Sequence, residues 1–163
     1  MIVGKMFDMK TSTRFAVATH ILTVLYVHED TPVPSSNIAQ SVNTSAAVIR
    51  QILMRLSEAG LVRSQMGPGG GSLLAKAADE ITLLDVWKAT EDEQVVCMPR
   101  NEPSGSCCVG QNILDALGQL DHDLQEALKG ALGSKTLEQF GSQVVKTCDQ
   151  EPPIEVAGLN APE

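Results

Sequence analysis

Aromatic residues are scarce in this chain of 163 residues, which contains one Trp, one Tyr and three Phe. Any core must therefore be aliphatic, and a hydrophobic fraction of 43% is ordinary for a globular protein. No apolar run approaches the roughly 18 residues that a membrane-spanning helix needs. The N-terminal segment lacks the apolar region of a secretory signal peptide. We therefore expect a cytoplasmic protein without membrane association.

The sequence also lacks the residue patterns that are typical of catalytic or metal sites. The three His are scattered, and no Cys-x-x-Cys or closely spaced His pair indicates a zinc site. The glycine-rich segment 67–71 is not followed by the Gly-Lys-Ser/Thr of a phosphate-binding loop. Without a sign of export, the four Cys are expected to be thiols or ligands rather than structural disulfides. We do not expect an enzyme.

The net charge of −8 is distributed unevenly along the chain. Residues 1–78 contain seven Lys/Arg and four Asp/Glu, whereas residues 79–163 contain five and sixteen. Affinity for phosphates depends on the local field of the binding face rather than on the total charge. Two interpretations remain open: an N-terminal half that meets nucleic acid, or a chance asymmetry between two solvated surfaces.

Helical periodicity predicts three helices in the first 60 residues, over about 11–28, 37–42 and 45–59. Two prolines end the first helix, an Asn-Thr-Ser turn separates the second from the third, and Gly60 follows the third as a C′ glycine. The third helix is amphipathic, and its predicted apolar side consists of Val48, Ile49, Ile52, Leu53 and Leu56. This pattern is typical of a helix-turn-helix.

Two strand-like segments, 61–66 and 72–76, flank the glycine-rich tip at 67–71. A hairpin directly after a recognition helix is a wing. The alternative, a loop that cradles a nucleotide phosphate, is disfavoured because no helix starts after the glycines. We therefore predict a mainly α fold: a winged helix-turn-helix with a small two-stranded β wing.

In the second half of the sequence, a helix is predicted at 79–91 and a loop with three of the four Cys at 95–108. A long helix at 109–132 and a short one at 136–145 follow. In the long helix, apolar residues alternate at steps of four and three, which favours a coiled-coil-like seam. The seam consists of Ile113, Leu117, Leu120, Leu124, Ala127 and Ala131. Its partner is expected to be a second copy of the chain, which makes this a dimerisation helix. A bundle helix within one chain remains the alternative.

The run VIRQILMRLSEAGLVRSQMGPGGGSLLAK (Val48–Lys76), preceded by TSTRFAVATHIL, resembles the Rrf2 family of bacterial transcriptional regulators, which includes IscR-, NsrR- and CymR-like proteins. The resemblance covers about residues 9–145, and the Cys-Cys-Val-Gly run at 107–110 is similar to a cluster-less, YwnA-like branch. It implies a homodimer that binds a near-palindrome in double-stranded DNA, with half-sites about one or two helical turns apart.

Four parts of the chain follow from the pattern and the resemblance together. They are an N-terminal extension (1–8), a winged helix-turn-helix domain (9–78), a cysteine loop with dimerisation helices (79–145) and a flexible acidic tail (146–163). The chain is predicted to be a sequence-specific DNA-binding transcriptional regulator that acts as a repressor. A winged-helix adaptor that binds proteins and not DNA is the alternative.

Residue types around the predicted recognition helix suit DNA contact. Arg50 can donate two hydrogen bonds to guanine, and Gln51 can pair with adenine. The candidate DNA-binding residues are Arg14, Thr44, Ser45, Ala47, Arg50, Gln51, Arg55, Arg63, Gly69, Gly70 and Lys76. Many relatives have an arginine just before the wing glycines, whereas this chain has Met66, which cannot exploit the negative potential of a narrow minor groove. We expect weaker binding by the wing.

The resemblance also bears on the cysteines, because iron–sulfur relatives have three in this loop. Cys97 and Cys108 match the first and the last, the middle one is absent, and Cys107 is additional. Gln111 stands where some relatives have a histidine.

Three hypotheses for these cysteines remain open. A 2Fe–2S cluster needs four ligands, so partner-subunit residues or His20 would have to contribute. A thiol switch would pair Cys97 with Cys107 or Cys108. In the third hypothesis these thiols sense nothing. Cys148 is expected to be inert.

Overall fold

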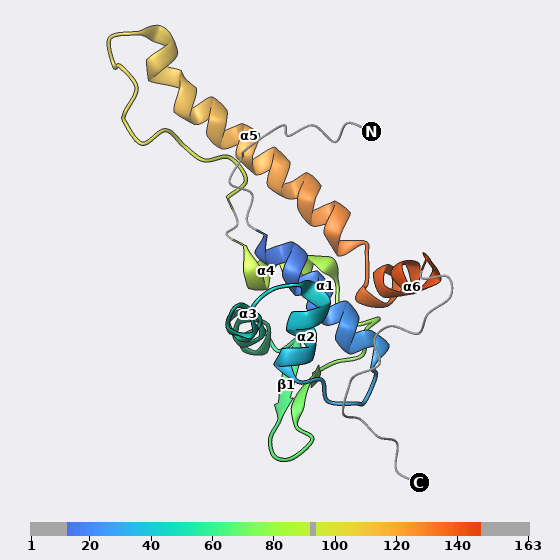
Figure 1. Ribbon diagram of the computed structural model, residues 1–163. Coiled ribbons are helices and arrows are strands. Elements are labelled where there is room, and N and C mark those ends of the chain that lie inside the picture. The colour runs from blue at the N-terminus through green and yellow to red at the C-terminus, as the bar shows by residue number, and fades with distance from the viewer. Residues whose placement is uncertain (1–12, 92–93, 148–163) are drawn as a thin grey trace, which may run out of the picture.

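The computed structural model describes residues 13–91 and 94–147 (Figure 1). The first part contains α1 (Arg14–Val27), α2 (Ser35–Val42), α3 (Ala46–Glu58), β1 (Val62–Gln65) and β2 (Gly71–Leu74). The first part ends with α4 (Leu83–Thr90), and the second contains α5 (Cys108–Gly133) and α6 (Leu137–Thr147). This order confirms the predicted fold class, a mainly helical winged helix-turn-helix with a two-stranded wing and a long C-terminal helix.

The core lies where α1 to α4 meet, and it is aliphatic, as the composition predicts. Its most buried side chains include Ile21, Leu22, Leu25, Ile38, Ile49, Leu56 and Ile81. Burying each of them stabilises the fold by roughly 1.5–3 kcal/mol. Two of the few aromatic rings, Phe15 on α1 and Trp87 on α4, meet edge to face with centroids 5.4 Å apart. The core residues of α3 hold its inner face against the domain, and the outer face of α3 is left open.

The start of α3 differs from the sequence prediction. Ser45 is the N-cap rather than the first helical residue, and its Oγ accepts a hydrogen bond of 3.4 Å from the Val48 N–H. The prediction that Val48 lies on the apolar side was wrong, since its side chain is 39% exposed. Ala46 packs against the core in the first turn instead, and Ile49 follows it three residues later. Gly60 has a φ of 69°, as expected of a C′ glycine.

The helix predicted at 79–91 is shorter in the structure, where α4 begins at Leu83. Thr82 and Asp85 form a capping box: Thr82 Oγ1 accepts from the Asp85 N–H (3.1 Å), and Asp85 Oδ2 accepts from the Thr82 N–H (2.9 Å). Ile81 is buried, and its carbonyl accepts a hydrogen bond from the Leu137 N–H at 2.8 Å. These bonds keep the segment before Leu83 outside the helix.

The other boundaries differ from the predictions by one to three residues. α2 begins at Ser35, directly after the extended Pro34 and two residues before the predicted start. α6 continues to Thr147, and the segment predicted as a tail from residue 146 therefore starts inside a helix. The predicted extension 1–8, the first residues of the helix predicted from residue 11, and Cys148 lie outside the described residues.

The wing is an antiparallel hairpin that is joined to the connection between α1 and α2. Gly67 and Gly69 turn the tip with positive φ values of 101° and 74°. Behind the tip, the Val33 N–H donates to the Ser72 carbonyl (3.0 Å), and the Ser72 N–H donates to the Val33 carbonyl (2.9 Å). A Cβ on Gly71 would overlap the Val33 backbone. The wing base is therefore fixed to the domain.

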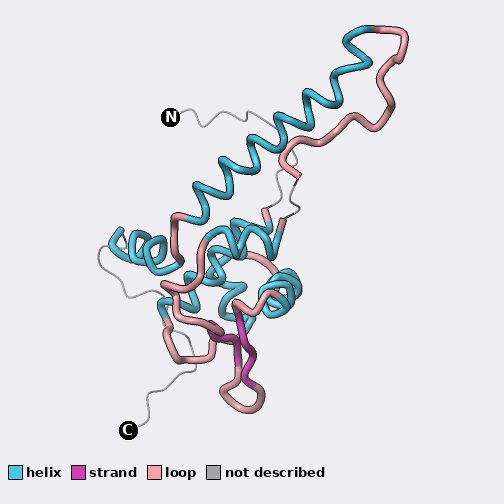
Figure 2. The backbone as a smooth tube through the Cα atoms, turned by 180° about the vertical axis from the view of Figure 1, so that it is seen from behind, coloured by secondary structure: helices cyan, strands magenta, loops and turns pink. Residues whose placement is uncertain are grey.

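The long helix α5 projects away from the winged domain, and the segment 94–107 runs beside it toward its far end (Figures 1 and 2). At its near end α5 packs on α4, and the chain then turns into α6, which packs on α1. Tyr26 on α1 and Ser142 on α6 share a hydrogen bond of 2.9 Å between their hydroxyls. A Cβ on Gly141 would overlap the Tyr26 ring, so this helix contact needs a glycine.

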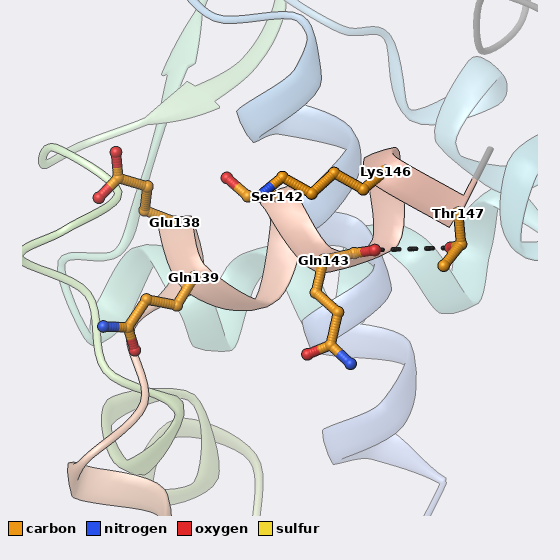
Figure 3. Close-up of a pocket in the computed structure, with 6 residues that line it drawn as sticks. All are labelled: Glu138, Gln139, Ser142, Gln143, Lys146 and Thr147. Atoms are coloured by element: carbon orange, nitrogen blue, oxygen red, sulfur yellow. Dashed lines mark hydrogen bonds between the residues drawn. The ribbon is translucent and has the colours of Figure 1, made fainter. Parts of the chain in front are cut away.

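The outer face of α6 has a shallow groove of about 500 Å³. It is lined by Glu138, Gln139, Ser142, Gln143, Lys146 and Thr147 (Figure 3). The bond drawn there runs from Thr147 Oγ1 to the Gln143 carbonyl (3.5 Å), within the helix itself. The groove is the open polar side of one helix, and nothing about it indicates a ligand.

Candidate DNA interface and cysteine loop

The outer face of α3 brings several of the predicted DNA-binding residues together. Ala47, Gln51 and Arg55 are spaced by four residues, so they lie on one side of the helix, and all three are exposed. Ser45 is exposed at the N-cap, and Thr44 before it is half-buried. The amides of the first turn are at the positive end of the helix dipole, which favours a phosphate there.

Arg50 points in a different direction from Gln51. Consecutive helical residues are rotated by about 100°, since a turn holds 3.6 residues. Arg50 lines a groove of about 620 Å³ between α3 and the wing, together with Ser64, Gln65 and Gly71. The sequence predicted that Arg50 and Gln51 both read bases. The structure places Arg50 beside the wing and Gln51 on the outer face.

The wing carries its positive charge at its base and not at its tip. Met66 at the tip is 95% exposed. Gly69 is exposed, Gly70 is half-buried, and the Gly70 N–H closes the turn on the Gly67 carbonyl at 2.9 Å. The exposed Arg63 and Lys76 line a groove of about 520 Å³ at the wing base. Acidic side chains share that groove, namely Glu29, Asp30 and Glu80.

Arg14 lies away from the wing. Its guanidinium is 3.5 Å from the Glu91 carboxylate, which also accepts a hydrogen bond from the Phe15 N–H at 3.0 Å. Tyr26, near the other end of α1, lines the groove at the wing base. Arg14 and Tyr26 are twelve helical steps apart, or about 18 Å at a rise of 1.5 Å per residue. A DNA contact by Arg14 near the wing stays a prediction.

His20 on α1 faces α2 and not the cysteine loop. Its Nε2 lies 2.9 Å from the Ser41 hydroxyl, across the contact between the first two helices. Partial burial lowers the pKa of His20, which favours the neutral ring. The described residues therefore give His20 a role in helix contact rather than in binding a cluster.

The start of the cysteine loop is held by Asp121, a residue that sequence reasoning missed. Asp121 is buried in the middle of α5, and its Oδ1 accepts hydrogen bonds from the N–H groups of Val96 (2.7 Å) and Val95 (2.8 Å). Its Oδ2 accepts from the Gln125 side-chain amide at 2.8 Å. The Val96 amide is the largest of the causes that lower the pKa of Asp121, and it outweighs the opposing effect of burial.

The end of the loop is held at the first turn of α5. The Gln111 side-chain amide donates to the Gly105 carbonyl at 2.7 Å. The Cys107 N–H donates to the Ser104 carbonyl at 3.3 Å, and a Cβ on Gly110 would overlap the Ser104 backbone. Gln111, in the place where some relatives have histidine, therefore helps to hold the loop.

These two anchors keep the cysteines apart. Cys97 follows Val96, which is bound to Asp121, whereas Cys108 begins α5. Positions 108 and 121 are thirteen helical steps apart, a distance of about 20 Å at a rise of 1.5 Å per residue. The Cα atoms of a disulfide are only about 6 Å apart. The structure therefore does not bring Cys97 together with the other two thiols within one chain.

The same separation bears on an iron–sulfur cluster. Among the described residues, no three His, Cys, Asp or Glu side chains gather closely enough to hold a metal ion. Cys97, Cys107 and Cys108 are all exposed thiols. In this arrangement the described residues of one chain do not fit a 2Fe–2S cluster, which needs four ligands around two neighbouring irons.

The surroundings of Cys107 change the pKa of its thiol. Cys107 is the N-cap residue of α5 and is exposed. The amides of Gly110 and then Val109, in the first turn, lower the pKa of the Cys107 thiol. Amides that point toward a sulfur favour the thiolate, the reactive form. Cys107 is therefore the best-placed nucleophile of the cysteine loop.

The predicted seam lies along α5 as an incompletely covered apolar strip. Ile113 and Leu117 are half-buried, and Leu120 and Leu124 are 48% and 40% exposed. Val109, four residues before Ile113 and 67% exposed, extends the strip by one step. Sequence reasoning missed Val109 because it sits at the predicted helix boundary. No helix in the described part of the chain is long and apolar enough to cross a membrane.

A recognition helix with an open polar face, a glycine-tipped wing beside it and a projecting helix define a winged-helix DNA-binding protein. The Rrf2 family, described as iron-dependent transcriptional regulators, matches residues 11–143. The chain belongs to the Rrf2 family. It is accordingly a DNA-binding transcriptional regulator and not an enzyme, as the sequence predicts.

Individual relatives agree with this membership. The chain is 35% identical over 127 residues to the HTH-type transcriptional regulator YwnA of Bacillus subtilis, covering 78% of this chain and 93% of YwnA. It is 34% identical to the regulator IscR of Cronobacter sakazakii, covering 85% and 83% of the two chains. The solved structure of CymR, the global cysteine regulator of B. subtilis, is similar with a TM-score of 0.62 and 28% identity, covering 83% and 98%.

Proposed function

We propose that this chain is a homodimeric repressor that binds a near-palindromic operator in the cytoplasm. Each protomer inserts α3 into the major groove of one half-site and lays its wing on the neighbouring backbone. The observation that carries the proposal is the exposed strip of Ala47, Gln51 and Arg55 on α3, directly beside the groove that Arg50 shares with the wing.

The contacts divide by chemistry. Gln51 is placed to read a base, since it is exposed on the outer face near the start of the helix. Arg50, Arg55, Arg63 and Lys76 supply phosphate contacts, which give affinity and orientation without reading sequence. Thr44 and Ser45 bring hydroxyls near the phosphates, and Gly69 and Gly70 lack side chains, which allows the wing backbone to approach them. Arg14 lies at the opposite end of α1 from the wing base.

Dimerisation is supported by the apolar strip on α5. Val109, Leu120 and Leu124 are 67%, 48% and 40% exposed on a helix that projects from its own domain. A helix with such a strip is stabilised by packing against another helix. A second copy of the chain supplies the same strip, and two-fold symmetry then presents two α3 helices to a palindrome.

DNA selection and solution mass together test this function. The full chain is used to enrich duplexes from a random library, and its mass is measured by light scattering. We expect an inverted repeat and the mass of a dimer. Leu120→Glu places a charge on the strip and should give monomers that lose the repeat, whereas Gln119→Glu adds the same charge one residue away and should not. A monomeric wild type, or no enriched sequence, contradicts the proposal.

Control of this repressor by its cysteines is the finer part of the proposal. A thiol switch at Cys107 is favoured by its lowered pKa and its accessibility. The Cys107 thiolate reduces hydrogen peroxide to water and becomes a sulfenic acid, which a thiol then converts to a disulfide with loss of water. Cys97 and Cys108 are the other candidates of the loop.

An iron–sulfur cluster is the second candidate for control, because the family description is iron-dependent. It requires ligands beyond those that one chain assembles. Anaerobic purification, an iron assay and a visible spectrum separate the two. A colourless, iron-free protein whose DNA affinity changes with peroxide supports the thiol switch, provided that peroxide does not change the DNA affinity of Cys107→Ser. DNA binding that ignores both iron and oxidant contradicts both forms of control.

A further inference from the structure

We propose that Val48 is a specificity-determining residue that selects thymine through contact with its C5-methyl group. The inference rests on the proposed sequence-specific reading of DNA by α3, and it names part of what is read. Its starting point is an aliphatic side chain that the core does not use. Val48 is 39% exposed, whereas its neighbour Ile49 is completely buried.

Val48 lies in the part of α3 that comes closest to DNA in a winged helix-turn-helix. Its N–H is bound by the Ser45 side chain at the N-cap, so it belongs to the first turn. The first turns of a recognition helix contact the base edges in the major groove. Ala47 beside it is exposed and has no side chain beyond Cβ, which allows the helix to approach closely.

The side chain of Val48 offers methyl groups and no hydrogen-bonding group. In the major groove, only thymine presents a methyl group, and the edges of adenine, guanine and cytosine present donors and acceptors. A valine against those polar edges would displace water without replacing its hydrogen bonds, which is unfavourable. Against thymine it buries apolar surface on both sides. Val48 therefore favours thymine by attraction and disfavours the other bases by desolvation.

The spacing between Val48 and Gln51 on α3 predicts where the thymine lies in the half-site. Val48 and Gln51 are three residues apart on α3, so their Cβ atoms are about 5–6 Å apart. Successive bases on one strand are about 3.4 Å apart along the axis. The two side chains therefore reach base pairs one or two steps apart. We expect each half-site to contain a thymine within two base pairs of the adenine that Gln51 reads.

Other exposed apolar residues of this face do not share the position. Met54, 59% exposed, lies nearly two turns further along α3 and lines the groove toward the wing. Met66 is at the wing tip, outside the helix. Met54 therefore provides a matched control, an exposed apolar side chain on the same helix away from its first turn.

The test removes single methyl groups from the DNA. The full chain first enriches a sequence from random duplexes. Each thymidine of a half-site is then replaced by deoxyuridine, which keeps base pairing and lacks only the methyl group. We expect one position at which uracil weakens binding of the wild type by about fourfold, the factor that corresponds to burying one methyl group. Val48→Ala should bind both duplexes equally, and Met54→Ala should keep the wild-type ratio.

Three outcomes overturn the inference. Equal binding of thymine and uracil duplexes at every position excludes methyl reading, as does a Val48→Ala variant that keeps the difference. A library with no enriched sequence overturns the proposed function and the inference together, whereas enrichment without a uracil effect overturns the inference alone. Affinity for random duplexes and the melting temperature show that Val48→Ala is folded.

Discussion

The Val96 backbone N–H donates a hydrogen bond of 2.7 Å to Asp121 Oδ1 and so ties the cysteine loop to the middle of α5. The neighbouring Val95 amide donates to the same oxygen at 2.8 Å. Cys97 is the next residue along the chain, so its distance from the thiols at the far end of α5 depends on one carboxylate. This relationship leads to the first prediction.

Replacing Asp121 by Asn should release the start of the loop. Asn is neutral, and charge-assisted hydrogen bonds are about twice as strong as neutral ones. Under mild oxidation, Asp121→Asn should form a disulfide between Cys97 and Cys107 or Cys108 faster than the wild type, as measured by peptide mass spectrometry. Asp115→Asn, on the same helix and exposed, is the control. Equal rates in all three proteins would show that Asp121 does not keep the thiols apart.

Alkylation of Cys107 should reach half its maximal rate at a lower pH in the folded protein than in the urea-unfolded chain. The reason is that first-turn amides lower its pKa, and only the thiolate reacts. The measurement uses iodoacetamide on a variant that retains Cys107 as its sole thiol. Because the folded pKa is the lower one, the thiolate contributes stability above the unfolded pKa, and this contribution is lost as pH falls through the folded pKa. Superimposable pH profiles would refute the effect.

Met66→Arg should strengthen DNA binding and make it more dependent on salt. An arginine at the exposed wing tip is attracted by a narrow minor groove. One further phosphate contact steepens the plot of log affinity against log salt by about 0.9. Fluorescence anisotropy at several salt concentrations measures this slope. Gln119→Arg adds the same charge on the projecting α5 and should leave the slope unchanged. A slope that stays the same in Met66→Arg would place the wing tip away from the DNA.

Thr82→Ala should lower the free energy of unfolding by about 1 kcal/mol, the usual value of an N-cap side chain. Thr82 Oγ1 accepts from the Asp85 N–H at 3.1 Å, and the alanine removes this side-chain acceptor at the start of α4. Urea denaturation followed by circular dichroism gives the value. Thr13→Ala is the matched control, because Thr13 is the N-cap residue of α1 but makes no side-chain capping bond. Equal losses in the two variants would argue against the capping box.

The winged helix-turn-helix was predictable because its signals are local. Gly60, Gly67 and Gly69 have the positive φ values that glycine adopts most readily. The start of α4 has a local signal, the capping box of Thr82 and Asp85, but it also depends on the bond between Ile81 and Leu137, which are far apart in sequence. The exposure of Val48 was not predictable. Helical spacing alone cannot decide whether a residue at the edge of an apolar side faces the core or the solvent.

The candidate site was predictable in its residue types and less so in its arrangement. The exposed strip on α3 follows from spacing by four residues, but the divergence of Arg50 toward the wing requires the neighbouring hairpin. The separation of Cys97 from Cys107 depends on Asp121, a single acidic residue whose burial no sequence pattern indicates. The direction of Arg50 and the separation of Cys97 from Cys107 both depend on contacts between segments that are distant in sequence.

The pairing of Val33 with Ser72 bears on the kinetics of operator binding. Both of its hydrogen bonds, 3.0 and 2.9 Å long, are formed within the described domain and do not depend on DNA. The wing therefore docks as a preformed body, and little conformational freedom is lost when the complex forms. Association is then limited by orientation and by salt-dependent steering, which vary little between sequences. Good and poor operators should differ mainly in the lifetime of the complex.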